Sequence, residues 1–78
     1  MYYTYVLKSL KDNKLYVGFS ENLERQFKEH NDGLVQATKA RRPLILVYYE
    51  ACLQESKAVE REKYFKTGFG RRYLKIRL

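Results

Sequence analysis

The length of the chain is the feature that most limits its fold. With 78 residues it is about half the size of a usual domain, so it can build one hydrophobic core and no second domain. Hydrophobic residues make up 45% of the sequence and charged residues 32%, a balance typical of globular proteins rather than of disordered chains. We therefore expect residues 1–78 to form a single domain, with any catalytic site at the surface of its core.

Positive charge distinguishes this composition from that of an average domain. Sixteen Lys and Arg residues stand against nine Asp and Glu residues, which gives a net charge of +7. Such a surface attracts polyanions, so nucleic acid is the partner that the charge favours. Charge alone does not separate a nucleic-acid-binding protein from a ribosome-bound or merely basic one.

The lone cysteine and the short apolar runs indicate the compartment. Cys52 has no partner for an internal disulfide and cannot build a cysteine-based zinc site. The longest apolar run, Leu44 to Tyr49, is far shorter than the roughly twenty residues that cross a bilayer, and the N-terminus lacks a signal-peptide pattern. We expect a cytoplasmic protein with no membrane partner, monomeric by default.

The first half of the chain predicts a β-hairpin followed by a helix. Residues 1–7 and 15–19 are rich in Tyr, Val and Thr, and a polar turn separates them. Ser20 is a suitable N-cap for a helix over residues 21–31. Gly33 is expected to end this helix, since glycine is preferred just past a helix C-terminus.

The second half predicts one more strand and one or two helices. The nearly unbroken apolar run Leu44 to Ala51 is typical of a central strand covered on both faces. A helix is expected from residue 55 or 56 to about Thr67, with Gly68 as its stop, and residues 71–78 are a candidate for a short third helix. The order β-β-α-β-α, with a possible last helix, predicts an α+β fold with a three-stranded, largely antiparallel sheet flanked by helices.

One carboxylate interrupts the apolar face of the second predicted helix. Ala58, Glu62, Phe65 and Phe69 fall at i, i+4, i+7 and i+11 and so share one face. A carboxylate on such a face must be paired, hydrogen-bonded or bound to a metal. The residues leave two alternatives open, a metal ligand and a glutamate paired with a basic residue at the edge of the core.

The histidine and two of the tyrosines leave a similar choice. His30 is on the apolar face of the first predicted helix, where a histidine is more often a hydrogen-bonded core residue than a ligand. Tyr5 and Tyr16 face the same side of the sheet if the hairpin turn has two or four residues, and their hydroxyls could then converge. A cross-strand tyrosine pair that fills the core fits the spacing equally well.

The order and spacing of these motifs resemble the GIY-YIG nuclease family, in particular its small stand-alone members. The triplet Thr-Tyr-Val at residues 4–6 stands where GIY would be, and Tyr-Val-Gly at residues 16–18 matches YIG. Segments 22–30, 41–50 and 61–64 resemble the first helix, the third strand and the glutamate-bearing helix of the family. The resemblance covers nearly the whole chain and implies a small three-stranded antiparallel sheet among helices, the fold expected above.

The resemblance also implies a chemistry. It implies an endonuclease that hydrolyses nucleic-acid phosphodiester bonds with one divalent metal ion, Mg²⁺ or Mn²⁺, and with DNA as the expected partner. Glu62 would be the metal ligand, and Tyr16 would lie near the attacking water. Tyr5 would help to place Tyr16 or the phosphate, and His30 would be a hydrogen-bond partner at the edge of the site.

One position departs from the family pattern. The catalytic arginine of the family directly precedes the large apolar residue of the first helix, and Gln26 stands there. Arg25 is one residue earlier, and this offset turns a helical side chain by about 100°, so Arg25 should point away. Because glutamine carries no charge, it stabilises a developing phosphoryl charge less well, and reduced or lost activity is expected.

Two alternatives to the enzyme remain. One is a nucleic-acid-binding module of the same fold without catalysis. The other is a structural protein bound to ribosomal RNA, which needs no Glu62. The basic residues expected to contact nucleic acid are Lys39, Arg41, Arg42, Lys66, Arg71 and Arg72. The residues expected to contact ribosomal RNA in the structural protein are Arg41, Arg42, Arg71, Arg72, Lys75 and Arg77. The presence together of Tyr5, Tyr16, His30 and Glu62 favours the enzyme.

Overall fold

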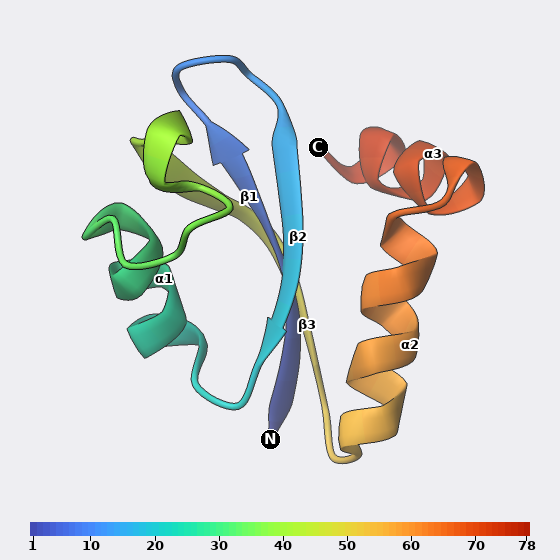
Figure 1. Ribbon diagram of the computed structural model, residues 1–78. Helices are drawn as coiled ribbons and strands as arrows, with labels where there is room; N and C mark the ends of the chain where they lie inside the picture. Colours follow the sequence, from blue (N-terminus) through green and yellow to red (C-terminus); the bar gives the residue numbers. More distant parts are fainter.

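The fold is a sheet with helices on both faces, as Figure 1 shows for the computed structural model, which describes residues 1–78. The sheet has three strands in the order β2-β1-β3, and both neighbouring pairs are antiparallel. No helix is long and apolar enough to cross a membrane. The elements are β1 (Tyr2–Ser9), β2 (Leu15–Ser20), α1 (Leu23–Asn31), the 3-10 helix η1 (Lys39–Arg41), β3 (Leu44–Cys52), α2 (Glu55–Phe65) and α3 (Gly68–Arg77). The predicted α+β fold is confirmed.

The sheet separates two small hydrophobic cores. Helix α1 covers one face, while α2 and α3 lie on the other (Figure 1). Successive residues of β1 point to opposite faces, as in any strand. Val6 therefore packs with Phe65 and Leu74 on the α2 side, whereas Tyr5 and Leu7 point to the α1 side.

The central strand is β1, so the prediction of a central third strand is wrong. Strand β3 is at the edge of the sheet, and all but one of its residues are exposed or half-buried. The apolar run Leu44 to Ala51 wrongly indicated a strand covered on both faces. Tyrosines within the run suit a half-exposed surface, where the ring packs and the hydroxyl stays in water. The hairpin and the return of β3 along the free side of β1 place β1 in the middle instead.

Helix α1 begins at Leu23 rather than at residue 21. Its N-cap is Asn22 and not Ser20, since Asn22 Oδ1 accepts a hydrogen bond from the backbone N–H of Arg25 at 3.0 Å. The Ser20 hydroxyl accepts from the backbone N–H of Asn22 at 3.0 Å and shapes the turn before the helix. At the other end Gly33 adopts φ +78°, as expected for a residue just past a helix.

Gly68 begins helix α3 instead of merely stopping α2, which ends at Phe65. The Thr67 hydroxyl caps α3 by accepting from the backbone N–H of Gly70 at 3.1 Å. Phe69 therefore belongs to α3, where it is exposed, and is not on the apolar face of α2. The turn between α2 and α3 is so tight that a Cβ on Gly70 would lie 2.6 Å from the Cα of Phe65.

A charged cluster fixes α2 against β3. Arg61 Nε and Nη2 donate to the two carboxylate oxygens of Glu50, each at 2.8 Å, and the Tyr48 hydroxyl donates to the same carboxylate at 2.7 Å. The guanidinium also lies 4.6 Å from the ring centroid of Phe65. A bidentate pair of this kind holds its helix in one orientation, and Glu62 follows next along α2.

Candidate active site

The strand register places Tyr5 and Tyr16 on the same face of the sheet. Tyr5 pairs with Gly18 across the hairpin, and Leu7 pairs with Tyr16. Since alternate residues share a face and antiparallel partners do too, both tyrosines point to the α1 side, as the spacing predicted. Tyr5 is buried, whereas Tyr16 on the edge strand is only half-buried.

Gly18 makes room for the Tyr5 ring. A Cβ at this position would lie 2.5 Å from the Cζ atom of Tyr5, far inside a normal contact distance. The phenol of the central strand therefore passes over Gly18 toward the free edge of β2. This explains in physical terms why the third residue of the Tyr-Val-Gly triplet has no side chain.

Gly18→Ala should destabilise the protein by displacing Tyr5. Overpacking a buried site costs about 1–3 kcal/mol, and in a domain of this size about 1 kcal/mol lowers the melting temperature by roughly 4–8 °C. Thermal denaturation measures the loss. Gly68→Ala is the matched control, because nothing lies within 4 Å of a Cβ added there. Equal melting temperatures for the two variants would contradict the packing of Tyr5 over Gly18.

His30 supports Tyr5 from inside the protein. Its Nε2 atom is 2.8 Å from the Tyr5 hydroxyl, and its Nδ1 atom is 2.7 Å from the Thr38 hydroxyl. The Tyr16 ring packs against the imidazole edge to face, with centroids 5.1 Å apart. His30 was expected at the edge of the site, but it is fully buried, because the loop that carries Thr38 covers it. It can act on a substrate only through its neighbours.

The contact with Thr38 favours one tautomer of the His30 imidazole. Its hydroxyl is fully buried, and His30 Nδ1 is the one side-chain partner it has. Burial lowers the pKa of His30, so the ring is neutral at neutral pH and has one donor and one acceptor. Leaving the hydroxyl proton unpaired would cost roughly 1–3 kcal/mol, which favours the tautomer in which Thr38 donates to Nδ1 and the Nε2–H donates to Tyr5. In that tautomer the buried Tyr5 hydroxyl needs an acceptor for its own proton within the site.

Stability should fall in mild acid because of His30. Burial lowers its pKa below the ordinary value of 6.5, against a smaller opposite effect of Glu29. Below about pH 6.5 the unfolded chain binds a proton that the folded chain does not, so the free energy of unfolding decreases until folded His30 also titrates; above that pH the contribution is complete. Melting temperatures between pH 5 and 8 should show this slope in the natural protein and a weaker slope in His30→Gln. Parallel plots of melting temperature against pH for the two proteins would contradict this role of His30.

The charge of Glu62 acts on both tyrosines although its helix lies on the opposite face of the sheet. Burial raises the pKa of Tyr16, and the negative charge of Glu62 raises it further. Burial also raises the pKa of Tyr5, to which the charges of Tyr16 and Glu62 add, while the side-chain amide of Gln26 lowers it. Both phenols are therefore protonated at neutral pH. The site spans the free edge of β2, with Gln26 on the α1 side and Glu62 on the α2 side.

The first helix presents Gln26 to the site and turns Arg25 away. Gln26 is half-buried beside the Tyr5 hydroxyl. The Arg25 side chain is 66% exposed, and its Nε atom is 3.6 Å from a carboxylate oxygen of Glu29 one turn later. This is the orientation expected from the 100° turn between neighbouring helical residues.

Glu62 is the carboxylate that a metal ion could use. Its side chain is 24% exposed, and its nearest cation, Lys66 Nζ, is 3.9 Å away, much farther than the 2.8 Å of the pair between Arg61 and Glu50. No group of three or more His, Cys, Asp and Glu side chains that could hold a metal occurs in the chain. A single carboxylate fits Mg²⁺ or Mn²⁺, since Mg²⁺ keeps several waters and takes other ligands from substrate phosphates.

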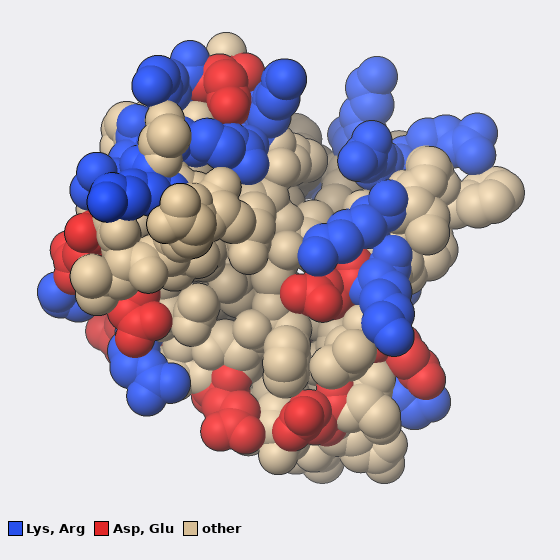
Figure 2. All heavy atoms as spheres, viewed as in Figure 1, with Lys and Arg blue, Asp and Glu red and all other residues tan.

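The basic residues expected to bind nucleic acid lie in two separate groups. Figure 2 shows blue areas on both upper sides of the molecule, a hollowed region between them, and most of the acidic side chains below. Arg41 is not a free cation, because its Nε atom donates to Asp12 at 3.2 Å. Arg42 Nε donates to the backbone carbonyl of Lys39 at 2.9 Å. The first group is Lys39, Arg41 and Arg42, in and after η1, and the second is Lys66, Arg71 and Arg72, at the end of α2 and in α3.

Comparison with known proteins identifies relatives along the whole chain. The UPF0213 protein SH2523 of Staphylococcus haemolyticus is 41% identical over 76 residues, which cover 96% of this chain and 92% of the relative. The UPF0213 protein CPE1444 of Clostridium perfringens is 43% identical over 67 residues, with coverage of 85% and 71%. The solution NMR structure of the UPF0213 protein BH0048 from Bacillus halodurans matches with a TM-score of 0.57 at 28% identity, over 95% of this chain and 82% of that one.

The family assignment follows from sequence and fold together. The sequence profile of the GIY-YIG catalytic domain matches residues 1–74. The tyrosine-bearing hairpin, the first helix and the glutamate-bearing helix all lie within this match. The chain belongs to the GIY-YIG catalytic domain family.

Proposed function

We propose that the chain is an endonuclease that hydrolyses nucleic-acid phosphodiester bonds with Mg²⁺ or Mn²⁺, and that DNA is its substrate. The observation that carries this proposal is the placement of Tyr5 and Tyr16 on one face of the sheet, where the charge of Glu62 acts on both phenols and the Gln26 amide acts on Tyr5. Membership of the GIY-YIG catalytic domain family supports a nuclease. The net charge of +7 supports a polyanionic substrate.

Each residue has a role that its surroundings suit. Glu62 would hold the divalent ion, which when bound polarises the scissile phosphate and stabilises the leaving oxygen. Tyr5, which is buried and has its oxygen held by His30, would help to place Tyr16 and would not touch the phosphate itself. Tyr16 is protonated in the resting site, so it would orient the attacking water by a hydrogen bond. Water attacks phosphorus, the bond to the leaving oxygen breaks, one water proton passes to solvent, and the leaving oxygen takes up a proton from solvent to give the free hydroxyl.

Because position 26 is a glutamine, we expect the enzyme to cleave slowly. The amide can donate a hydrogen bond to the phosphate but brings no positive charge to it. The same residue favours the second candidate function, a nucleic-acid-binding module without catalysis.

The test is cleavage of end-labelled DNA and RNA at low salt. Single strands, duplexes and branched DNA are each incubated with Mg²⁺, with Mn²⁺ and with EDTA. We expect products with either metal and none with EDTA. Binding without any product under all these conditions would overturn the enzyme and leave the binding module.

A further inference from the structure

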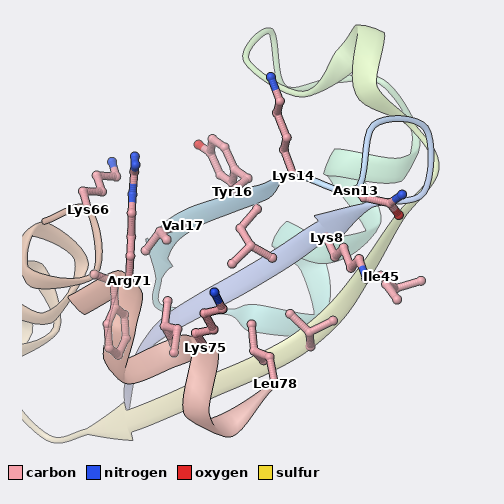
Figure 3. A pocket seen from close by; sticks show the side chains of 14 residues that line it. Lys8, Asn13, Lys14, Tyr16, Val17, Ile45, Lys66, Arg71, Lys75 and Leu78 are labelled. Carbon is pink, nitrogen blue, oxygen red and sulfur yellow. The ribbon is translucent and has the colours of Figure 1, made fainter. Parts of the chain in front are cut away.

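A groove opens beside Tyr16 on the α3 side of the sheet. Its volume is about 1260 Å³, and Figure 3 shows that side chains from the sheet and from α3 line it. This part of the sheet lies beyond the end of α2, so Leu15 and Ile45 on its surface stay exposed. Most of the apolar floor is aliphatic and comes from Leu15, Val17, Ile45, Val47, Leu74 and Leu78.

The rim of the groove is basic and contains no acidic residue. Lys66 and Arg71 lie on one side, and Lys14 lies on the hairpin side (Figure 3). Among the five cations, only Lys66 has a carboxylate within 4.0 Å, that of Glu62. The cations of the rim are Lys8, Lys14, Lys66, Arg71 and Lys75. An apolar floor between five cations, four of them without a carboxylate partner, suits a ligand that is both anionic and apolar.

We infer that this groove binds a single-stranded segment of nucleic acid next to the bond that is cut, an inference that rests on the proposed function. A single strand exposes base faces, which can pack on the floor, and phosphates, which can pair with the rim. A duplex hides its base faces in the stack, so the floor would gain nothing from it. Single strands and branched DNA with an unpaired arm are therefore the preferred substrate class.

The position of Tyr16 connects the groove to the candidate active site. Tyr16 lines the groove and also packs against His30. In Figure 3 its hydroxyl points toward the side of the groove that carries Lys66 and Arg71. Lys66 in turn lies one helical turn from Glu62. A strand whose phosphate reaches Glu62 and Tyr16 thus continues directly into the groove.

The test is binding in EDTA, which does not depend on cleavage. Fluorescence anisotropy compares a labelled 12-nucleotide oligothymidylate with an abasic strand of equal length and with a 12-base-pair duplex. The floor is aliphatic, so one packed base should gain only the low end of what bases gain on aromatic platforms, which predicts about fivefold weaker binding of the abasic strand. The duplex should also bind more weakly than the single strand. The inference would be overturned if the abasic strand and the duplex each bound as tightly as oligothymidylate or more tightly.

Charge reversal locates the binding within α3. Arg71→Glu and Lys75→Glu should each weaken oligothymidylate binding about fivefold or more. Lys57→Glu makes the same change on α2 outside the groove, where Lys57 Nζ lies 3.7 Å from a carboxylate oxygen of Glu60, and should weaken binding less than twofold. An equal effect of all three variants would overturn the inference, because the binding would then follow net charge.

Two other ligands of the groove, a lipid and a second copy of the chain, would each give a result that contradicts the inference. Tighter binding to phosphatidylglycerol vesicles than to oligothymidylate, lost in Lys75→Glu, would identify a lipid-binding groove. Self-association in sedimentation, lost in the same variant, would identify a contact with a second copy.

Selective single-strand binding without cleavage would support the groove and overturn only the proposed function. Cleavage that the Arg71 and Lys75 variants leave unchanged would overturn only the groove.

Discussion

Glu62→Gln should abolish metal-dependent cleavage and leave the fold intact. The change keeps the shape of the side chain and removes the charge that would hold the metal ion. Transition-state stabilisation by a metal ion is worth several kcal/mol, so the single-turnover rate should fall by about 10³-fold or more. The melting temperature should change little, because Glu62 has only a 3.9 Å contact with Lys66 to lose.

The same variant has a readout that needs no activity. Glu62 is the second cause, after burial, of the raised pKa of Tyr16. Glu62→Gln should therefore lower the pKa of Tyr16 toward its usual value of about 10, measured by NMR titration of the tyrosine ring. Glu60→Gln, an exposed change on the same helix, is the control and should alter neither rate nor pKa. A large loss of stability with an unchanged rate would identify Glu62 as a structural residue instead.

Gln26→Arg should raise the cleavage rate. Gln26 is beside the Tyr5 hydroxyl, so a guanidinium at this position would face the scissile phosphate. Electrostatic donors of this kind contribute about 10²-fold or more to related reactions. Affinity for nucleic acid should change much less, because one charge adds about one phosphate contact. Single-turnover rates and anisotropy on the same substrate separate the two effects.

Arg25→Ala is the control for the register of α1. The Arg25 side chain faces solvent next to Glu29, so its removal should leave the rate unchanged. If Arg25→Ala abolished cleavage and Gln26→Arg had no effect, Arg25 would be the functional arginine and the side-chain directions described for α1 would not hold in the complex with substrate.

The order of the elements was predictable because the signals for it are local. Turn residues separate the two hairpin strands, and Gly33 marks the end of α1 through its positive φ. The central place of β1 was not predictable from β3 alone, because it depends on the edge along which β3 returns. The start of α3 at Gly68 was missed since a glycine after a helix signals a stop, and the cap that Thr67 supplies needs the tight turn over Phe65.

Parts of the candidate site were predictable for geometric reasons. Strand alternation predicted the shared face of Tyr5 and Tyr16, and helical rotation predicted that Arg25 would point away. A hydrogen-bonded core histidine was one of the alternatives for His30, but its partner Thr38 was missed, because Thr38 lies in a loop without periodicity. The groove was missed as well, since it exists only where α3 faces the uncovered end of the sheet. No pattern along the chain connects Lys8 with Lys75.

The dependence of the single-turnover cleavage rate on Mn²⁺ concentration tests the proposed site most directly. The natural protein is mixed in excess with a labelled branched DNA, first in EDTA and then at increasing Mn²⁺. A site built on Glu62 predicts no cleavage in EDTA and a rate that rises and saturates with Mn²⁺. A rate that is the same in EDTA, or no cleavage at any Mn²⁺ concentration, would contradict a metal-dependent nuclease.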